Sequence, residues 1–287
     1  MKDVFIDTII DSIKILPFLF ITFLIMEYIE HKMTNKNRIL IQKAGKAGPA
    51  IGGLLGMVPQ CGFSASASNL YVAKIISIGT LLSVYLSTSD EMLPIFISEQ
   101  VSIVSIIEIL ALKAVIGIIF GFLIDFVYHK IDKSEEQIDI HNDICSHDHC
   151  HCDSENILVS SIKHTINIIF FIFVFSLIMN TLFHYIGEDN IRNIIYDKPI
   201  FSHILCGLLG LIPNCAASVI ITQLYLNSLI SFGTMMTGLL VGAGVGLLVL
   251  IKMNKSIKQN FKIISLLYFI GLFSGIVIDL LKIAVII

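Results

Sequence analysis

Charged residues are scarce in this sequence. Only 14% of the 287 residues are Asp, Glu, Lys or Arg, and 55% are hydrophobic, whereas soluble domains carry about 25% charged residues. The mean hydropathy is +0.87. This composition excludes an ordinary soluble domain and predicts a protein that crosses the lipid bilayer several times. The formal net charge of −3 offers no basic surface, so we expect no nucleic-acid partner.

Motifs for nucleotide hydrolysis and for hydrolytic enzymes are absent. The sequence contains no GxxxxGKS or GxxxxGKT phosphate loop, no HExxH motif and no GxSxG nucleophile elbow. We therefore expect neither ATP-driven pumping by this chain nor an enzyme, and no required cofactor. The N-terminus carries Asp3, Asp7 and Asp11 and lacks a basic segment followed by a cleavage site. The first apolar run is therefore expected to remain in the mature protein.

Long apolar runs are abundant by contrast. A helix needs roughly 20 apolar residues to span a bilayer. Six runs of about this length or longer lie at 13–29, 75–93, 101–127, 160–183, 229–250 and 263–286. We therefore predict an all-α polytopic protein in the cytoplasmic membrane of a prokaryote.

Two parts of the sequence repeat each other. Residues 53–66 read GLLGMVPQCGFSAS and residues 207–220 read GLLGLIPNCAASVI, at an offset of 154 (207 minus 53). This similarity predicts two copies of one unit. The expected units are residues 1–128 and 160–287, joined by a linker at 129–159.

Lysine and arginine are distributed differently in the two copies. Residues 31–47 and 252–262 are rich in these side chains, whereas 89–100 has none and 184–199 has only two. The positive-inside rule places the two basic loops in the cytoplasm and the other two outside. The copies are then inverted relative to each other, with both termini outside and the linker inside. Secondary transporters frequently have this architecture.

Both copies contain a proline within an apolar run. Proline removes a helix hydrogen bond, so we predict half-helices at 48–58 and 61–73, and at 199–212 and 215–226. Broken backbone inside a membrane is tolerated only where protein or a water-filled cavity satisfies it. The breaks therefore predict a substrate site that includes Pro59, Gln60, Cys61, Ser64, Asn69, Pro213, Asn214, Cys215, Ser218 and Gln223. The alternative to a substrate site is a packing kink. Each pair of half-helices forms either a re-entrant hairpin or two crossings, and counting the half-helices separately gives about ten hydrophobic segments.

The pattern G-x-x-G-x-x-P-x-C, followed by small and hydroxyl residues, occurs once in each half. It resembles the pattern of the ten-helix heavy-metal or arsenic exporters, which are similar in motif to the organoarsenical efflux permeases. Members of this family are also labelled manganese transporters. The resemblance implies export of a metal or metalloid ion. The organoarsenical permeases are richer in Cys and Pro at the break, whereas each break here has one Cys.

The residues at the breaks leave three substrate classes open. Paired thiolates from Cys61 and Cys215 would bind trivalent arsenic, which we favour, with proton antiport as the expected drive. A hard cation such as Mn²⁺ would instead use amide and carbonyl oxygens. An oxyanion would bind at half-helix N-termini, with Ser64 and Ser218 as donors.

Two acids end matching G-x-x-x-G-x-x-x-D stretches. Asp125 follows Gly117 and Gly121, and Asp279 follows Gly271 and Gly275. Small residues on one helix face predict close helix packing, which turns the acids towards the interior. An acid within a span is a functional candidate, so we predict that Asp125 and Asp279 couple transport to proton movement. The alternative is that they cap a helix terminus. Glu108 and Lys113 on the same span as Asp125 are expected in interior ion pairs.

The linker is rich in metal ligands. Seven of the residues in HNDICSHDHCHCD at 141–153 are potential ligands of Zn, Cu or Ni: His141, Cys145, His147, His149, Cys150, His151 and Cys152. We predict a cytosolic segment that gathers metal for an exporter. Two other interpretations stay open, a low-complexity linker and a membrane-bound metal sensor or partner-binding subunit. The sequence also allows a homo-oligomer.

Overall fold

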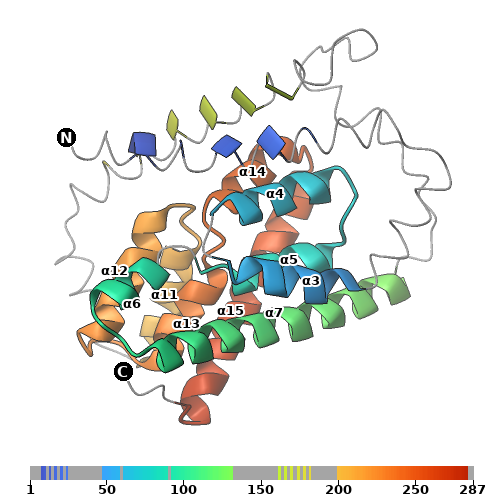
Figure 1. Ribbon diagram of the computed structural model, residues 1–287. Helices are drawn as coiled ribbons and strands as arrows, with labels where there is room; N and C mark the ends of the chain where they lie inside the picture. Colours follow the sequence, from blue (N-terminus) through green and yellow to red (C-terminus); the bar gives the residue numbers. More distant parts are fainter. Residues whose placement is uncertain are drawn as a thin grey trace, which may run out of the picture.

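The computed structural model describes residues 47–58, 61–89, 92–131 and 199–283, together with isolated helical residues within 8–24 and 161–181. The described part contains helices and no strand, which confirms the all-α fold class (Figure 1). Pro59, Gln60 and the predicted metal ligands at 141–152 lie outside the described residues.

The same series of five helices occurs twice. The first half contains α3 (Gly48–Gly56), α4 (Cys61–Val72), α5 (Ile78–Ser87), α6 (Met92–Ser98) and α7 (Ile103–Ile131). The second half contains α11 (Pro199–Gly210), α12 (Cys215–Leu226), α13 (Phe232–Val241), α14 (Val245–Met253) and α15 (Ile257–Leu280). Helices α4, α5 and α7 each begin 154 residues before α12, α13 and α15, the offset found in the sequence.

The two halves exchange their short helices. Helix α4 of the first half packs against α14 of the second, and α12 of the second half packs against α6 of the first. Figure 1 shows these two pairs apart from each other, with α5 and α13 between them. At the α4–α14 crossing, Ser68 Oγ and Tyr85 OH both donate to the Gly246 carbonyl, at 2.7 and 3.1 Å. The fold is thus interlocked across the repeat.

Both predicted proline-motif breaks are present. Helix α3 ends at Gly56 and α4 begins at Cys61, and α11 ends at Gly210 while α12 begins at Cys215. Pro213 lies in the irregular turn between α11 and α12, as expected for a residue that cannot continue the helical hydrogen bonding. The half-helices at 61–72 and 215–226 match their predicted bounds to within one residue.

Two further segments are broken, which the sequence analysis did not predict. The runs at 75–93 and 229–250 were expected to be continuous, but α5 ends at Ser87 before α6, and α13 ends at Val241 before α14. Gly244 lies in the second of these breaks with φ 52°, a conformation that favours glycine. A hydropathy average over the whole run detects neither break.

Two loop and side-chain expectations were also wrong. Residues 89–100 were expected to form an outward loop, but Met92–Ser98 forms α6 and packs against α12. Its apolar side chains need a buried partner, and α12 supplies one. Glu108 was expected in an interior ion pair, but it lies on the outer face of α7 and is exposed.

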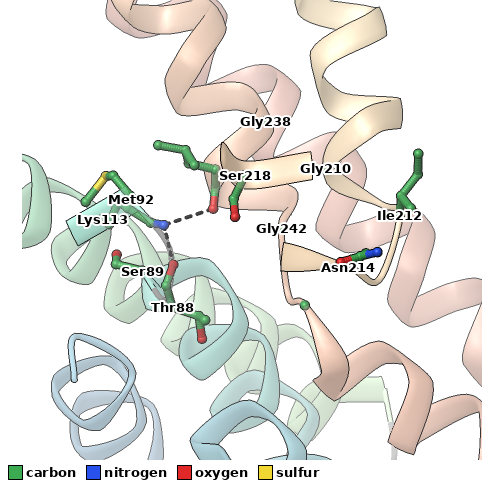
Figure 2. A pocket seen from close by; sticks show the side chains of 12 residues that line it. Thr88, Ser89, Met92, Lys113, Gly210, Ile212, Asn214, Ser218, Gly238 and Gly242 are labelled. Atoms are coloured by element: carbon green, nitrogen blue, oxygen red, sulfur yellow. Dashed lines mark hydrogen bonds between the residues drawn. The ribbon is translucent and has the colours of Figure 1, made fainter. Parts of the chain in front are cut away.

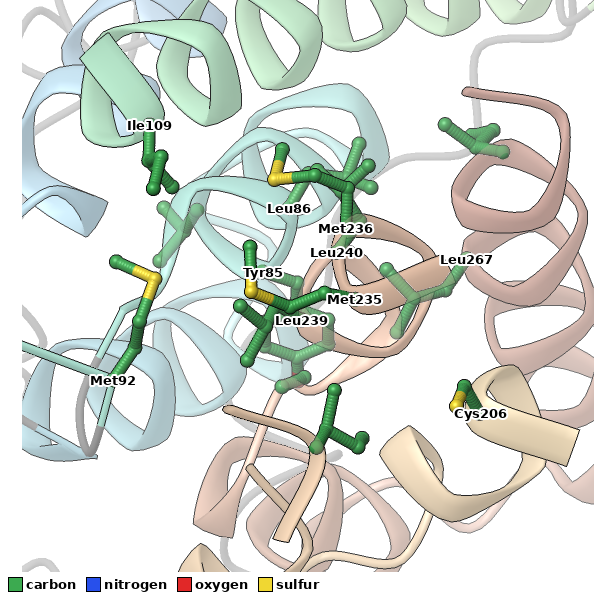
Figure 3. Packing of buried hydrophobic residues seen from close by; sticks show 14 of the residues in the cluster. Tyr85, Leu86, Met92, Ile109, Cys206, Met235, Met236, Leu239, Leu240 and Leu267 are labelled. Carbon is green, nitrogen blue, oxygen red and sulfur yellow. The ribbon is translucent and has the colours of Figure 1, made fainter. Parts of the chain in front are cut away.

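The core lies around α13. Among the described residues, three segments are long and apolar enough to cross a membrane: Ile103–Tyr128, Phe232–Met253 and Ile257–Leu280. In the most apolar stretch of Phe232–Met253, 83% of the residues are buried, compared with only 39% in each of the other two segments. Figure 3 shows Met235, Met236, Leu239 and Leu240 of α13 within the core. Helices α7 and α15 therefore present the apolar outer faces that a bilayer would cover.

Candidate functional site

A pocket lies where the broken segments meet (Figure 2). The α5–α6 break, the α11–α12 break and the α13–α14 segment contribute to it, and α7 adds one side chain. Its lining residues are Thr88, Ser89, Met92, Lys113, Gly210, Ile212, Asn214, Ser218, Gly238, Leu239, Gly242 and Gly244. Both halves of the repeat therefore build one site from irregular backbone.

The pocket is small. Its cavity volume is about 20 Å³, and a single water needs roughly 10–15 Å³. A metal hydroxide or a hydrated ion is larger than one water. The pocket of this compact state would therefore have to widen before it could hold such a species.

Lys113 is the one charged residue among the described pocket-lining residues. It is 0% exposed and lies near the middle of the apolar span Ile103–Tyr128. Its Nζ donates to the carbonyl of Thr88 and, at 2.9 Å, to that of Leu239. These carbonyls lie at the C-terminal ends of α5 and α13, where helix dipoles attract a cation. The Lys113 ammonium therefore connects the two halves at the pocket.

The predicted binding residues of the second motif are divided between the pocket and the surface. Asn214 and Ser218 line the pocket, and Pro213 lies in the adjoining turn. Gln223 is exposed, further along α12. Helix α12 therefore faces the pocket through its first turn and not through its later residues.

The described residues of the first motif lie beside the pocket without lining it. Ser64 and Asn69 of α4 are both 0% exposed. A Cβ atom on Gly246 would lie 2.8 Å from Ser64 Cβ, so α4 and α14 touch at this point. Both amide atoms of Asn69 are buried without a hydrogen-bond partner, which is rare in native structures. The Asn69 side chain is therefore a buried amide whose hydrogen-bonding atoms have no partner in this compact state.

The two motif cysteines begin equivalent helices. Cys61 is the first residue of α4 and Cys215 is the first residue of α12, and their side chains lie outside the described atoms. Cys206 is different: it is 0% exposed in the hydrophobic core, as a small apolar residue would be.

The two predicted coupling acids occupy equivalent places. Asp125 Oδ2 accepts from Ser77 Oγ at 2.6 Å, and Oδ1 accepts from the Gly79 N–H at 2.9 Å. Asp279 makes the same contacts with Ser231 Oγ and, at 2.7 Å, with the Gly233 N–H. Each acid therefore caps the N-terminus of a neighbouring helix, where negative charge is stabilised.

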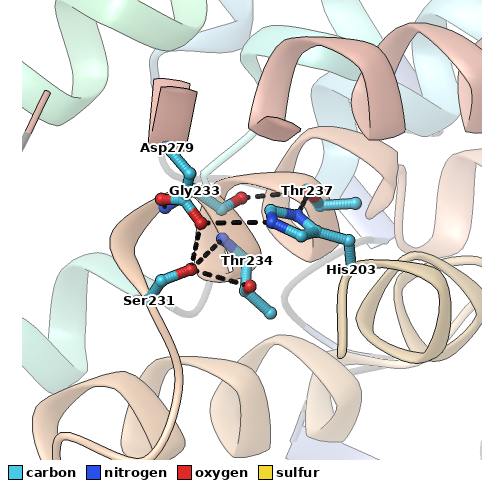
Figure 4. Close-up of polar contacts among 6 residues, drawn as sticks. All are labelled: His203, Ser231, Gly233, Thr234, Thr237 and Asp279. Atoms are coloured by element: carbon cyan, nitrogen blue, oxygen red, sulfur yellow. Dashed lines mark hydrogen bonds and ion pairs between the residues drawn. The ribbon is translucent and has the colours of Figure 1, made fainter. Parts of the chain in front are cut away.

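His203 adds a titratable group to the second acid alone (Figure 4). Its Nε2 lies 3.1 Å from Asp279 Oδ2, and its Nδ1 lies 2.8 Å from Thr237 Oγ1. The histidine is 5% exposed. The sequence analysis missed His203 and the pocket position of Lys113. A comparison of the two copies could have found both residues. At the repeat offset, His203 corresponds to Pro49 and Lys113 corresponds to Leu267, so neither residue is repeated.

Comparison with known proteins identifies a family. The model of the family described as "Putative, 10TM heavy-metal exporter" matches residues 1–185 and 154–286, which together cover almost the whole chain. The match agrees with the resemblance seen in the motifs and with a multi-pass membrane protein. Neither the curated proteins nor the solved structures that were compared contain a match.

Proposed function

Because the chain belongs to the family of ten-helix heavy-metal exporters, we propose that it is a secondary-active exporter that moves a metal or metalloid by alternating access. The observation that carries this proposal is the pocket built by broken helices of both halves. Broken helices free backbone groups for a substrate and let short segments tilt separately. The proposed location is the cytoplasmic membrane of a prokaryote, with the two halves inverted relative to each other.

The proposed cycle opens the pocket to one side at a time. The exchanged pairs α4–α14 and α6–α12 lie apart from each other in the fold (Figure 1). Tilting one pair away from the α5–α13 core would open the pocket on that side, while the other pair stays closed. The compact pocket of this structure corresponds to the intermediate between the two open states.

The favoured substrate is a trivalent arsenic species. Its hydroxide is neutral near pH 7, so the buried Lys113 ammonium in the pocket wall would not repel it. The same ammonium would oppose a free divalent cation at short range. We propose that Cys61 and Cys215, at the N-termini of α4 and α12, supply the thiolates that bind arsenic.

A divalent cation such as Mn²⁺ is the second candidate. Thr88, Ser89, Asn214 and Ser218 bring side-chain oxygens to the pocket wall, and a hard cation prefers oxygen ligands. Asp90 and Glu91 lie in the sequence between Ser89 and Met92, which both line the pocket. These acids lie outside the described residues, and carboxylates are ligands that a hard cation prefers.

Growth and cell metal content in a metal-sensitive host would test the exporter and its substrate. Cells expressing the protein would be compared with empty cells in arsenite, methylarsenite, Mn²⁺, Zn²⁺ and Cd²⁺. Arsenic export predicts that Cys61→Ser combined with Cys215→Ser abolishes resistance, while the core control Cys206→Ser retains it. Resistance to Mn²⁺ that survives the double substitution but not Asp90→Asn would favour the second candidate. Equal sensitivity with and without the protein to every ion would contradict the exporter proposal.

The His/Cys-rich linker is proposed to gather Zn, Cu or Ni on the cytosolic side. Deleting residues 141–152 separates this role from a sensor. A transporter should keep its flux at saturating substrate and lose it only at low substrate concentration, whereas a sensor would lose its function entirely. Metal content of the purified full-length protein, with and without the segment, would show whether the linker binds metal.

A further inference from the structure

The His203–Asp279 contact has no equivalent in the first half. Asp125 makes the same capping contacts as Asp279, but residue 49, at the repeat offset from His203, is proline. The repeat therefore provides an internal control. The acid, the serine hydroxyl and the backbone N–H suffice to cap a helix, so the histidine is not needed for the cap.

Both ring nitrogens of His203 have a polar partner. Nδ1 lies 2.8 Å from Thr237 Oγ1, which also lies 3.0 Å from the Gly233 carbonyl oxygen, and Nε2 lies 3.1 Å from Asp279 Oδ2. A neutral histidine carries hydrogen on one of these nitrogens, whereas a protonated histidine donates from both.

The strength of the contact between His203 Nε2 and Asp279 Oδ2, at 3.1 Å, depends on the protonation of the pair. An imidazolium facing the carboxylate forms an ion pair. A neutral histidine that carries its hydrogen on Nε2 forms a weaker hydrogen bond, and a lone pair on Nε2 facing an ionised carboxylate is repulsive. Loss of a proton from the pair therefore weakens the contact.

The other titratable groups around His203 are few within the described part of the chain. Helix α13, which packs against α11, carries none. Helix α15 contributes Asp279 and Tyr268, whose hydroxyl donates to the Ile204 carbonyl at 3.4 Å, and Lys282 follows the helix end. Helix α12 carries Cys215 and Tyr225. Asp279 is the only carboxylate among these described groups.

The pair is connected mechanically to the pocket. His203 lies near the start of α11, and the same helix ends at Gly210, which lines the pocket together with Ile212 of the following turn. Seven residues separate His203 from Gly210, which is roughly 10 Å along a helix. A movement of α11 away from α15 would therefore displace the pocket wall.

We propose that the His203–Asp279 pair carries the proton that is exchanged for substrate, and that the second half alone is proton-coupled. In the step we infer, the imidazolium of His203 releases a proton to water. Neutral His203 then faces ionised Asp279, their ion pair is lost, and α11 moves with its pocket residues. Rebinding of a proton restores the contact. This inference rests on the proposed exporter function and names its coupling residues.

Transport by the full-length protein in liposomes separates coupling from transport itself. Arsenite and Mn²⁺ are used as probes in two assays, accumulation driven by a pH gradient and exchange of probe for probe at equal pH on both sides. Exchange needs no net proton movement. The variants are His203→Gln and Asp279→Asn, and His129→Gln on α7 is the histidine control.

The wild-type protein and His129→Gln should perform both reactions. His203→Gln and Asp279→Asn should keep exchange within about twofold, while gradient-driven accumulation falls at least tenfold and no longer changes with pH. Unchanged gradient-driven accumulation by His203→Gln would overturn the inference. Loss of both reactions in both variants would overturn it too, because the pair would then be structural. A wild-type protein that exchanges neither probe would instead contradict the exporter function on which the inference rests.

Discussion

The two halves of the chain share their helix-end chemistry and differ at single buried positions. Asp125 caps α5 and Asp279 caps α13, each through a serine hydroxyl and a glycine N–H at equivalent positions. The matched contacts concern helix ends and close packing, which both copies need in order to fold. Two of the unmatched residues, Lys113 and His203, are buried and polar. Differences between the copies therefore indicate function more directly than their similarities do.

Lys113 shows why an unmatched residue is informative. The repeat offset places Leu267 at its counterpart position, and Leu267 is fully buried in the hydrophobic core. An apolar residue thus satisfies the fold at that position of the second half. A buried lysine carries a large desolvation penalty, so its presence in the first half requires a compensating role at the pocket.

The largest loss of stability and export is expected from Lys113→Leu, which gives the first half the leucine that the second half has at the equivalent position, Leu267. The substitution removes the donor to the carbonyls of Thr88 and Leu239. Each buried carbonyl that loses its partner costs about 1–3 kcal/mol, so stability should fall by about 2–6 kcal/mol. Thermal unfolding of the purified protein and export by cells would both report this loss.

Lys113→Arg and Glu108→Gln provide the controls. Arginine keeps the charge and donors but is larger, so we expect part of the stability to return and transport to stay impaired. Glu108 is exposed on the same helix, and its substitution should change neither measurement. A Lys113→Leu protein that is as stable and active as the wild type would remove the role that we assign to the buried ammonium.

An intermediate effect in both halves is expected from filling the glycine contacts. A Cβ atom on Gly121 would lie 2.8 Å from the Gly79 carbonyl oxygen, and one on Gly275 would lie 2.5 Å from that of Gly233. The Gly275 Cβ would lie even closer to Thr237 Oγ1. Overpacking of this kind costs about 1–3 kcal/mol. Gly121→Ala and Gly275→Ala should therefore both lower the unfolding temperature, with the larger decrease for Gly275→Ala.

Gly242→Ala is the matched control for these two substitutions. Its added Cβ would meet its nearest neighbour at 3.3 Å, and its φ of −69° suits alanine. The unfolding temperature should change little. If Gly275→Ala were tolerated and Gly121→Ala were not, the two helix pairs would not be packed equivalently, and the symmetry between the halves would be lost.

The sequence alone predicts the features that depend on local chemistry. Proline and glycine end helices through their own backbones, so the motif breaks next to Cys61 and Cys215 were visible without a structure. The glycines before Asp125 and Asp279 likewise predicted the close packing that their helices show. These features follow from a few neighbouring residues and from their repetition.

The pocket depends on contacts that no local pattern encodes. The breaks at Thr88 and Gly242 lie in runs whose average hydropathy is high, so they were read as continuous spans. Lys113 is far in sequence from Leu239, and His203 is 76 residues from Asp279. Only the packing of helices that are distant in sequence brings such residues together.

The smallest effect is expected at the helix caps, and it tests the similarity of the halves most closely. Ser77 Oγ accepts from the Thr80 N–H, and Ser231 Oγ accepts from the Thr234 N–H, both at 3.1 Å. Replacing an N-cap serine by alanine costs about 0.5–2 kcal/mol. Ser77→Ala and Ser231→Ala should therefore destabilise the purified protein by similar small amounts in thermal unfolding. Ser231→Ala should also change the pH dependence of transport, because Ser231 contacts the carboxylate that faces His203. A matching change in Ser77→Ala would mean that both acids, and not the second alone, take part in coupling.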